Sequence, residues 1–117
     1  MTALRLISLP THAVLELAGG LVLMAIPFLL GFTPAGLVAA VAVGALVVGL
    51  ALSATATDGS GLHIAAHFAF DRGIALGLLG GALVLGLAGD TAAAAVFAAA
   101  SLGQAALNLT TRYTARA

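Results

Sequence analysis

Residues 17–57 read LAGGLVLMAIPFLLGFTPAGLVAAVAVGALVVGLALSATAT and contain no Asp, Glu, Lys or Arg. The hydrocarbon core of a bilayer is about 30 Å thick, so one helical crossing takes roughly 20 residues. The letters GFTPAG at 31–36 divide the stretch into two parts of about that length. Thr33 is a typical N-cap residue and Pro34 a typical first helical residue, which indicates a tight turn before a second helix. The stretch therefore predicts a membrane hairpin.

The rest of the chain has the same character. Residues 73–89 and 91–111 also lack charged side chains, and of all 117 residues 62% are apolar, 7% are charged and none is cysteine. The mean hydropathy is +1.22. This composition predicts one all-α membrane domain, 1–117, whose partner is the lipid bilayer. It excludes a nucleic-acid binder, a disulfide framework and a second, soluble domain. We expect an up-down bundle of two tandem hairpins, with transmembrane helices at about 12–31, 35–54, 62–88 and 91–110.

The arginines predict the orientation of the chain. Arg5 precedes the first span, whereas Arg112 and Arg116 follow the fourth. Positively charged residues near the ends of spans stay in the cytoplasm. Both termini and the Gly-rich loop Thr55–Gly61 are therefore expected to lie in the cytoplasm, and the two short turns outside.

The sequence also indicates an internal repeat. A shift of 55 residues places HAVLE at 12–16 over HFAFD at 67–71. A shared bias toward Ala, Leu and Gly accounts for part of the identity between the aligned residues. The repeated His-x-x-x-carboxylate pattern is a stronger signal, because the chain has only three His and four acidic residues. We expect a tandem duplication with repeats 12–57 and 67–112. The two repeats enter the membrane in the same direction, so their His and carboxylate residues should meet across the bundle centre.

The stretch GLVLMAIPFLLGF at 20–32, followed by a short turn and a Gly/Val-rich helix, resembles the SPW-repeat family of small bacterial membrane proteins. Ile26-Pro27-Phe28 stands where the family has Ser-Pro-Trp. The resemblance covers residues 12–54 and reaches the second hairpin only through the repeat. It implies a two-helix unit in a bacterial inner membrane, with no activity attached to it.

Polar side chains gather at the predicted cytoplasmic ends of the helices. Those that suit a divalent metal are His12, Glu16, His63, His67 and Asp71. Imidazoles and carboxylates from facing helices are ligands for Zn²⁺, Fe²⁺ or Mn²⁺. Two other interpretations are a haem held by His12 and His67 as axial ligands, and a proton relay.

A structural interpretation needs no ligand. Gln104, Asn108 and Arg112 form an i, i+4 series on the fourth helix, and Arg72 follows Asp71 directly. We expect these residues to form an interior polar network, with Arg72 within salt-bridge distance of Glu16 or Asp71. Such a network explains the polar residues by mutual pairing, and a cation beside Asp71 disfavours a divalent metal.

Small residues mark one face of the third helix. Gly73, Gly77 and Gly81 continue a stripe that begins at Ala65 and Ala69. A stripe of this kind lets another helix approach closely. It predicts packing within the bundle or, as an alternative, a homodimer face.

Function is less constrained than architecture. We find no nucleophile–base pair, phosphate loop or open ligand set in the sequence, so we expect no enzyme and no obligatory cofactor. We predict a small membrane protein of structural, accessory or oligomer-forming role, with itself or another membrane protein as partner. The alternatives are metal or haem binding, and proton or ion transport through a polar path.

Overall fold

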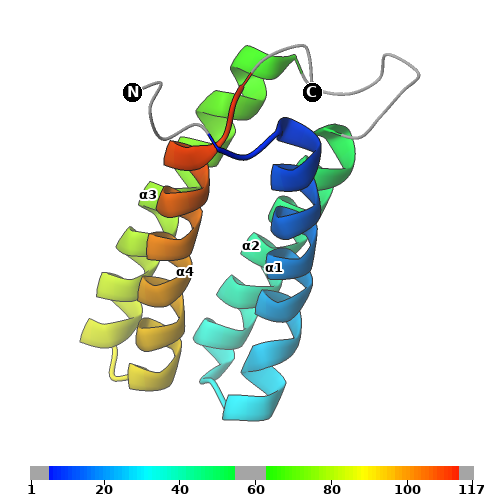
Figure 1. Cartoon of the computed structure of the whole chain (residues 1–117). Helices are drawn as coiled ribbons and strands as arrows, with labels where there is room; N and C mark the ends of the chain where they lie inside the picture. Colours follow the sequence, from blue (N-terminus) through cyan, green and yellow to red (C-terminus); the bar gives the residue numbers. More distant parts are fainter. Residues whose placement is uncertain (1–5, 55–62, 114–117) are drawn as a thin grey trace.

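The computed structural model describes residues 6–54 and 63–113. Its elements are α1 (Leu9–Leu30), α2 (Pro34–Ala54), α3 (Ile64–Leu87) and α4 (Thr91–Thr110). α1 packs mainly on α2 and α3 on α4, so that two hairpins stand side by side (Figure 1). All four helices are long and apolar enough to cross a membrane. The predicted fold class, a four-helix membrane bundle built from two hairpins, is confirmed.

Some sequence-based predictions fall on other parts of the chain. Arg5, the loop Thr55–Gly61 and Arg116 lie outside the described residues. The side of the membrane on which the termini lie therefore stays a prediction.

Capping residues fix the helix ends at the two short turns. Gly31 ends α1 in the left-handed conformation, with φ at 65°, which glycine adopts without strain. Asp90 accepts a hydrogen bond from the Ala93 amide and so caps α4. Its other carboxylate oxygen accepts from the Thr33 amide at 2.8 Å and from the Thr33 hydroxyl at 2.7 Å. One aspartate thus joins the turn of the first hairpin to the turn of the second.

Glycine sets the distance between α1 and α2. A Cβ atom placed on Gly44 would lie 2.8 Å from the backbone oxygen of Gly20, and one placed on Gly20 would lie 3.0 Å from the backbone oxygen of Gly44. Backbone atoms cannot yield as a flexible side chain does, so both positions require glycine. The two helices therefore meet backbone to backbone at this level.

The predicted glycine stripe of α3 is only partly a packing face. A Cβ atom on Gly81 would lie 2.8 Å from the Phe97 ring of α4, so this glycine does allow close packing. Gly73 and Gly77 have open space at the same point. The packing prediction is wrong for these two residues. Residues spaced four apart turn gradually around the helix axis, so only Gly81, at the end of the stripe, faces α4.

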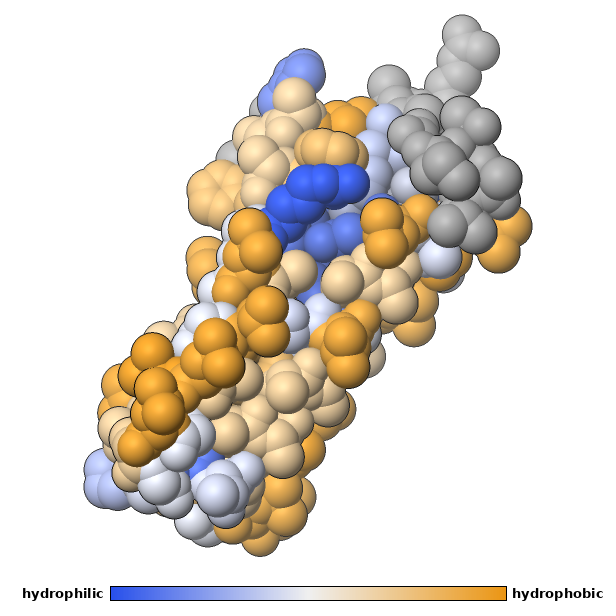
Figure 2. All heavy atoms as spheres, turned by 90° about the vertical axis from the view of Figure 1, so that its left-hand side faces the viewer, coloured by the Kyte–Doolittle hydropathy of each residue, from blue (hydrophilic) through white to orange (hydrophobic). Residues whose placement is uncertain are grey.

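Apolar residues cover most of the bundle surface. Large side chains such as Leu29 and Leu87 are 79% and 91% exposed. Figure 2 shows hydrophobic residues over most of one face, with hydrophilic residues in a hollow toward the end where the chain termini lie. The distribution suits a surface in contact with lipid acyl chains.

The same end of the bundle is closed by two extended segments. Ile7, just before α1, pairs in parallel with Thr111, just after α4. The Ile7 amide donates to the Thr110 oxygen at 2.9 Å, and the Arg112 amide donates to the Ile7 oxygen at 2.8 Å. This pairing holds the residues after α4 against the start of α1.

Candidate metal centre

Two i, i+4 pairs from different hairpins meet inside the bundle. His12 and Glu16 lie on α1, and His67 and Asp71 lie on α3, with no residue of the four more than 2% exposed. A spacing of four residues places both members of each pair on one helix face. The expectation that the two pairs meet across the bundle centre is confirmed.

Each histidine faces both carboxylates. His12 Nε2 lies 3.3 Å from Glu16 Oε2 and 3.0 Å from Asp71 Oδ2. His67 Nε2 lies 3.4 Å from Glu16 Oε1 and 3.5 Å from Asp71 Oδ1. A tetrahedral ion with ligand bonds of 2.0–2.1 Å holds its ligand atoms about 3.3 Å apart. The four nitrogen-to-oxygen distances are of this size, although His12 faces one oxygen of each carboxylate and His67 faces the other. One ligand atom from each residue can be chosen so that all lie within 4.8 Å of one another.

A hydrogen bond outside the cluster fixes the form of His12. Thr111 Oγ1 lies 2.6 Å from the backbone oxygen of Leu107, which can only accept, so the hydroxyl proton is used there. Thr111 Oγ1 must then accept at its 2.6 Å contact with His12 Nδ1. With the proton on Nδ1, Nε2 is the ring nitrogen that faces the two carboxylates; it donates to them when it is protonated and offers its lone pair to a metal when the imidazole is neutral. This is the form in which histidine binds a metal, with its other nitrogen held by an outer partner.

Other polar groups hold the carboxylates. Gln104 Nε2 donates to Glu16 Oε2 at 3.1 Å and to Asn108 Oδ1 at 2.8 Å. Tyr113 Oη donates to Asp71 Oδ2 at 2.5 Å. Burial and, after it, this contact with the Asp71 carboxylate raise the pKa of Tyr113 well above its usual range. The phenol therefore keeps its proton and stays a donor.

Several buried atoms at the centre have no hydrogen-bond partner among residues 6–54 and 63–113. They are Glu16 Oε1, Asp71 Oδ1 and both ring nitrogens of His67. An unpaired buried polar group costs about 1–3 kcal/mol, and more when it is charged. Of these atoms, His67 Nε2 lies 3.4 Å from Glu16 Oε1 and 3.5 Å from Asp71 Oδ1. The centre therefore has ligand atoms that the protein itself does not satisfy.

The structure places two other predicted site residues, His63 and Arg72, outside the cluster. His63 is exposed and caps α3 by accepting from the Ala65 amide, so it is no ligand with the other four. The Arg72 guanidinium lies 3.5 Å above the Phe68 ring, and its Nη1 has no hydrogen-bond partner in the described part of the chain. Within residues 6–54 and 63–113, no ion pair joins it to either carboxylate of the cluster. The predicted salt bridge of Arg72 is wrong, because one residue along a helix turns a side chain by about 100°.

The polar network on α4 differs from the predicted series at its end. Gln104 and Asn108 are buried, and Asn108 Nδ2 donates to the Asp71 backbone oxygen at 3.0 Å. Arg112 is exposed and meets the rest of the bundle through its backbone amide. Thr111 takes the place predicted for Arg112, since it follows Asn108 by three residues rather than four.

Sequence reasoning missed Thr111 and Tyr113. The i, i+3 relation of Thr111 to Asn108 was a usable signal. Tyr113 lies beyond α4, where no helical periodicity applies, and the pairing of Ile7 with Thr111 brings it to the cluster. Its ring packs edge-on against His12 with 5.5 Å between centroids.

The geometry does not suit haem. The His12 and His67 rings are 5.8 Å apart between centroids and inclined by 73°. Two axial histidines need a wide flat slot between them for the porphyrin. Here the carboxylates of Glu16 and Asp71 touch both imidazoles and fill that space. Of the two cofactor types considered from sequence, a single metal ion fits the residues better.

Comparisons with family models, with curated proteins and with solved structures find no match to this chain. The resemblance to the SPW-repeat family therefore stays a prediction from the first hairpin.

Proposed function

We propose that this membrane protein binds one divalent transition metal ion, best suited to Zn²⁺, through His12, Glu16, His67 and Asp71. The observation that carries the proposal is the set of buried, mutually facing ligand atoms that lack protein partners. Two imidazole nitrogens and two carboxylate oxygens make a common tetrahedral donor set for zinc. Fe²⁺ and Mn²⁺ share these ligands but favour more than four of them.

Charge supports a cation at this place. Glu16 and Asp71 bring two carboxylates into a helix bundle that crosses a bilayer, where unpaired charge is costly. The structure pairs neither with Lys or Arg over the described part of the chain. With both histidines neutral, as metal ligands must be, one divalent ion would supply the two positive charges that balance the carboxylates.

The metal would have a structural consequence. Its ligands come in equal numbers from α1 and α3, which belong to different hairpins and contact each other little. An ion bound by both helices would cross-link the hairpins, and its binding free energy would stabilise the fold. This agrees with the structural or accessory role expected from the sequence. If the arginine-based orientation holds, the site lies in the cytoplasmic half of the membrane.

Transport is less well supported. The core beyond the cluster, toward the short turns, is packed with apolar side chains such as Leu78, Leu85 and Phe97. Among the described residues of that core, none carries a titratable side chain until Asp90 at the turns. An ion or proton path through both halves of the membrane would need polar groups there.

Metal stoichiometry tests the proposal. The full-length protein in detergent is stripped with a chelator, reloaded with Zn²⁺, desalted and measured by inductively coupled plasma mass spectrometry. We expect one zinc per chain and a higher melting temperature in the presence of zinc. His67→Asn should lose both effects. The matched control is His63→Asn, which changes an exposed histidine of the same helix and keeps a good capping residue.

Two results would overturn the proposal. One is wild-type protein that stays folded by circular dichroism yet retains no zinc after desalting. The other is a His63→Asn variant that loses zinc as completely as His67→Asn does.

A further inference from the structure

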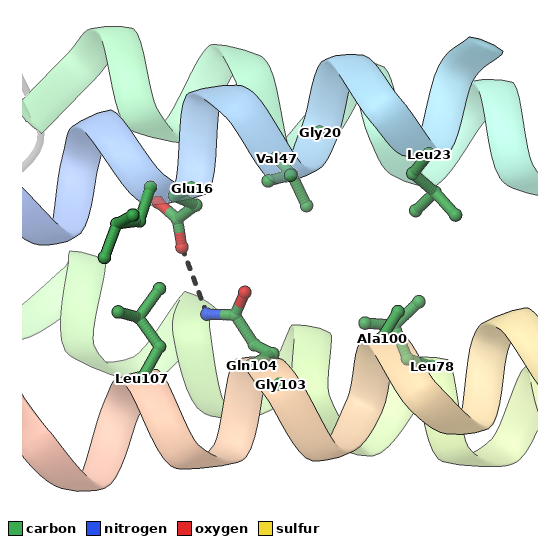
Figure 3. A pocket seen from close by; sticks show the side chains of 11 residues that line it. Glu16, Gly20, Leu23, Val47, Leu78, Ala100, Gly103, Gln104 and Leu107 are labelled. Carbon is green, nitrogen blue, oxygen red and sulfur yellow. Dashed lines mark hydrogen bonds between the residues drawn. The ribbon is translucent and has the colours of Figure 1, made fainter. Parts of the chain in front are cut away.

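A cavity of about 330 Å³ lies beside the candidate metal centre, between α1 and α4. Its inner wall is apolar and buried, with Leu23 from α1, Val47 from α2 and Leu78 from α3. Gly19 and Gly103 line its exposed side, and a Cβ atom at either would meet nothing within 4 Å. Figure 3 shows the space between the two helices at this level. Because both glycines lie within membrane-spanning helices, the cavity opens toward the bilayer.

One end of this cavity is polar. Glu16 and Gln104 line it there, joined by the hydrogen bond drawn in Figure 3. Both amide protons of Gln104 are accounted for, because its Nε2 donates to Glu16 and to Asn108. Its remaining polar atom, the amide oxygen, points into the space between α1 and α4 (Figure 3). The cavity thus combines an apolar wall with one free acceptor at its end.

We propose that this cavity binds a lipid-soluble molecule with a neutral hydroxyl head and an alkyl chain, such as a long-chain alcohol. The hydroxyl donates to the amide oxygen of Gln104, and the chain lies against Leu23, Val47 and Leu78. An anionic head is disfavoured because the Glu16 carboxylate stands at the same end. A cationic head would meet the same carboxylate, but both Glu16 oxygens already face His12 and His67, and the head would have to leave its hydration shell in an apolar cavity, which is costly. The proposal goes beyond metal binding and does not require it, since Gln104 and the apolar wall are present either way.

The test uses the full-length protein in phosphatidylcholine vesicles and a hexadecanol analogue that carries a photoreactive diazirine on its chain. Cross-linked peptides are identified by mass spectrometry, and unlabelled hexadecanol or its methyl ether is added as competitor. We expect cross-links on α1 and α4 around the cavity. Hexadecanol should compete about fivefold better than the ether, the ratio given by one ordinary hydrogen bond. Gln104→Leu should abolish this preference.

Blocking the cavity gives a second readout. Gly103→Leu places a side chain at the cavity's exposed side, where the structure has room for it, and should reduce specific cross-linking at least fivefold. Gly80→Leu is the matched control, because Gly80 is an exposed α3 glycine with equally open surroundings away from the cavity. Equal competition by alcohol and ether, better competition by hexadecylamine, or unchanged cross-linking in Gly103→Leu would each overturn the proposal. Zinc stoichiometry of the same samples is measured separately, so its failure is distinguishable from failure of the cavity proposal.

Discussion

Replacing Thr111 by valine should weaken metal binding without touching a ligand. Thr111 is 2% exposed, and valine has nearly the same shape as threonine. The substitution removes the hydroxyl that lies 2.6 Å from His12 Nδ1, together with its bond to the Leu107 oxygen. His12 then loses the contact that keeps its proton on Nδ1 and its Nε2 lone pair toward the cluster.

The size of the effect follows from the role of such outer contacts. Loss of the group that orients a metal-binding histidine typically lowers metal affinity about 10- to 100-fold. This corresponds to about 1.4–2.7 kcal/mol of binding free energy. Because His12 is buried, its Nδ1 proton is left without this acceptor, and some loss of fold stability should accompany the substitution. We expect the loss of zinc affinity in Thr111→Val to exceed the change in zinc affinity caused by substitutions on the exposed surface of the helices.

The assay is a zinc competition titration against a chromophoric chelator in detergent. Thr110→Val is the matched control, because the Thr110 hydroxyl contacts only the Ala106 and Leu107 carbonyl oxygens and not the cluster. We expect Thr110→Val to bind zinc within twofold of wild type. If Thr111→Val also binds within twofold, the assignment of His12 as an oriented ligand is refuted. Equal losses in both variants would show a general effect of the helix end.

Three further predictions concern other parts of the molecule. Gly44→Leu should lower the stability of the protein by about 1–3 kcal/mol through overpacking, whereas Gly49→Leu, with open space around its Cβ, should not; equal denaturation midpoints would contradict the backbone contact of α1 with α2. The Thr33 hydroxyl, followed by the Ala93 amide, lowers the pKa of Asp90 below its usual 3.8, so its contribution to stability is complete above that pH and is lost as pH falls through the folded-state pKa. The difference in melting temperature between wild type and Asp90→Asn should therefore be largest near neutral pH and should disappear in acid. A difference independent of pH would contradict this. Tyr113, the only tyrosine in a chain without tryptophan, should show no tyrosinate absorbance at pH 11 until the protein unfolds, because burial and the nearby carboxylate raise its pKa; ordinary titration near pH 10 would refute its burial at the cluster.

The helices could be read from the sequence because long charge-free stretches leave a bilayer-spanning helix as the economical structure. The centre of the candidate site could be read for a similar reason. Its four residues occur as two i, i+4 pairs, and helical geometry places each pair on one face. Both inferences use periodicity along a single helix, which a sequence displays directly.

The rest depends on which helix faces which, and periodicity does not contain that information. Gly20 and Gly44 form the close contact of α1 with α2, yet nothing along the chain distinguishes them from Gly73 and Gly77, which face open space. Arg72 follows Asp71 in sequence, but its guanidinium lies over the Phe68 ring. Tyr113 reaches the cluster through a pairing of two extended segments at opposite ends of the chain.

Zinc K-edge X-ray absorption of the protein loaded with one equivalent of Zn²⁺ tests the metal assignment most directly. The structure predicts a four-coordinate ion with two imidazole nitrogens and two carboxylate oxygens at about 2.0–2.2 Å. The scattering from two imidazole rings should remain in His63→Asn, whereas His67→Asn should retain no zinc after desalting and give no imidazole-bound zinc signal. A six-coordinate shell of oxygen without imidazole scattering in wild-type protein would contradict the proposed centre.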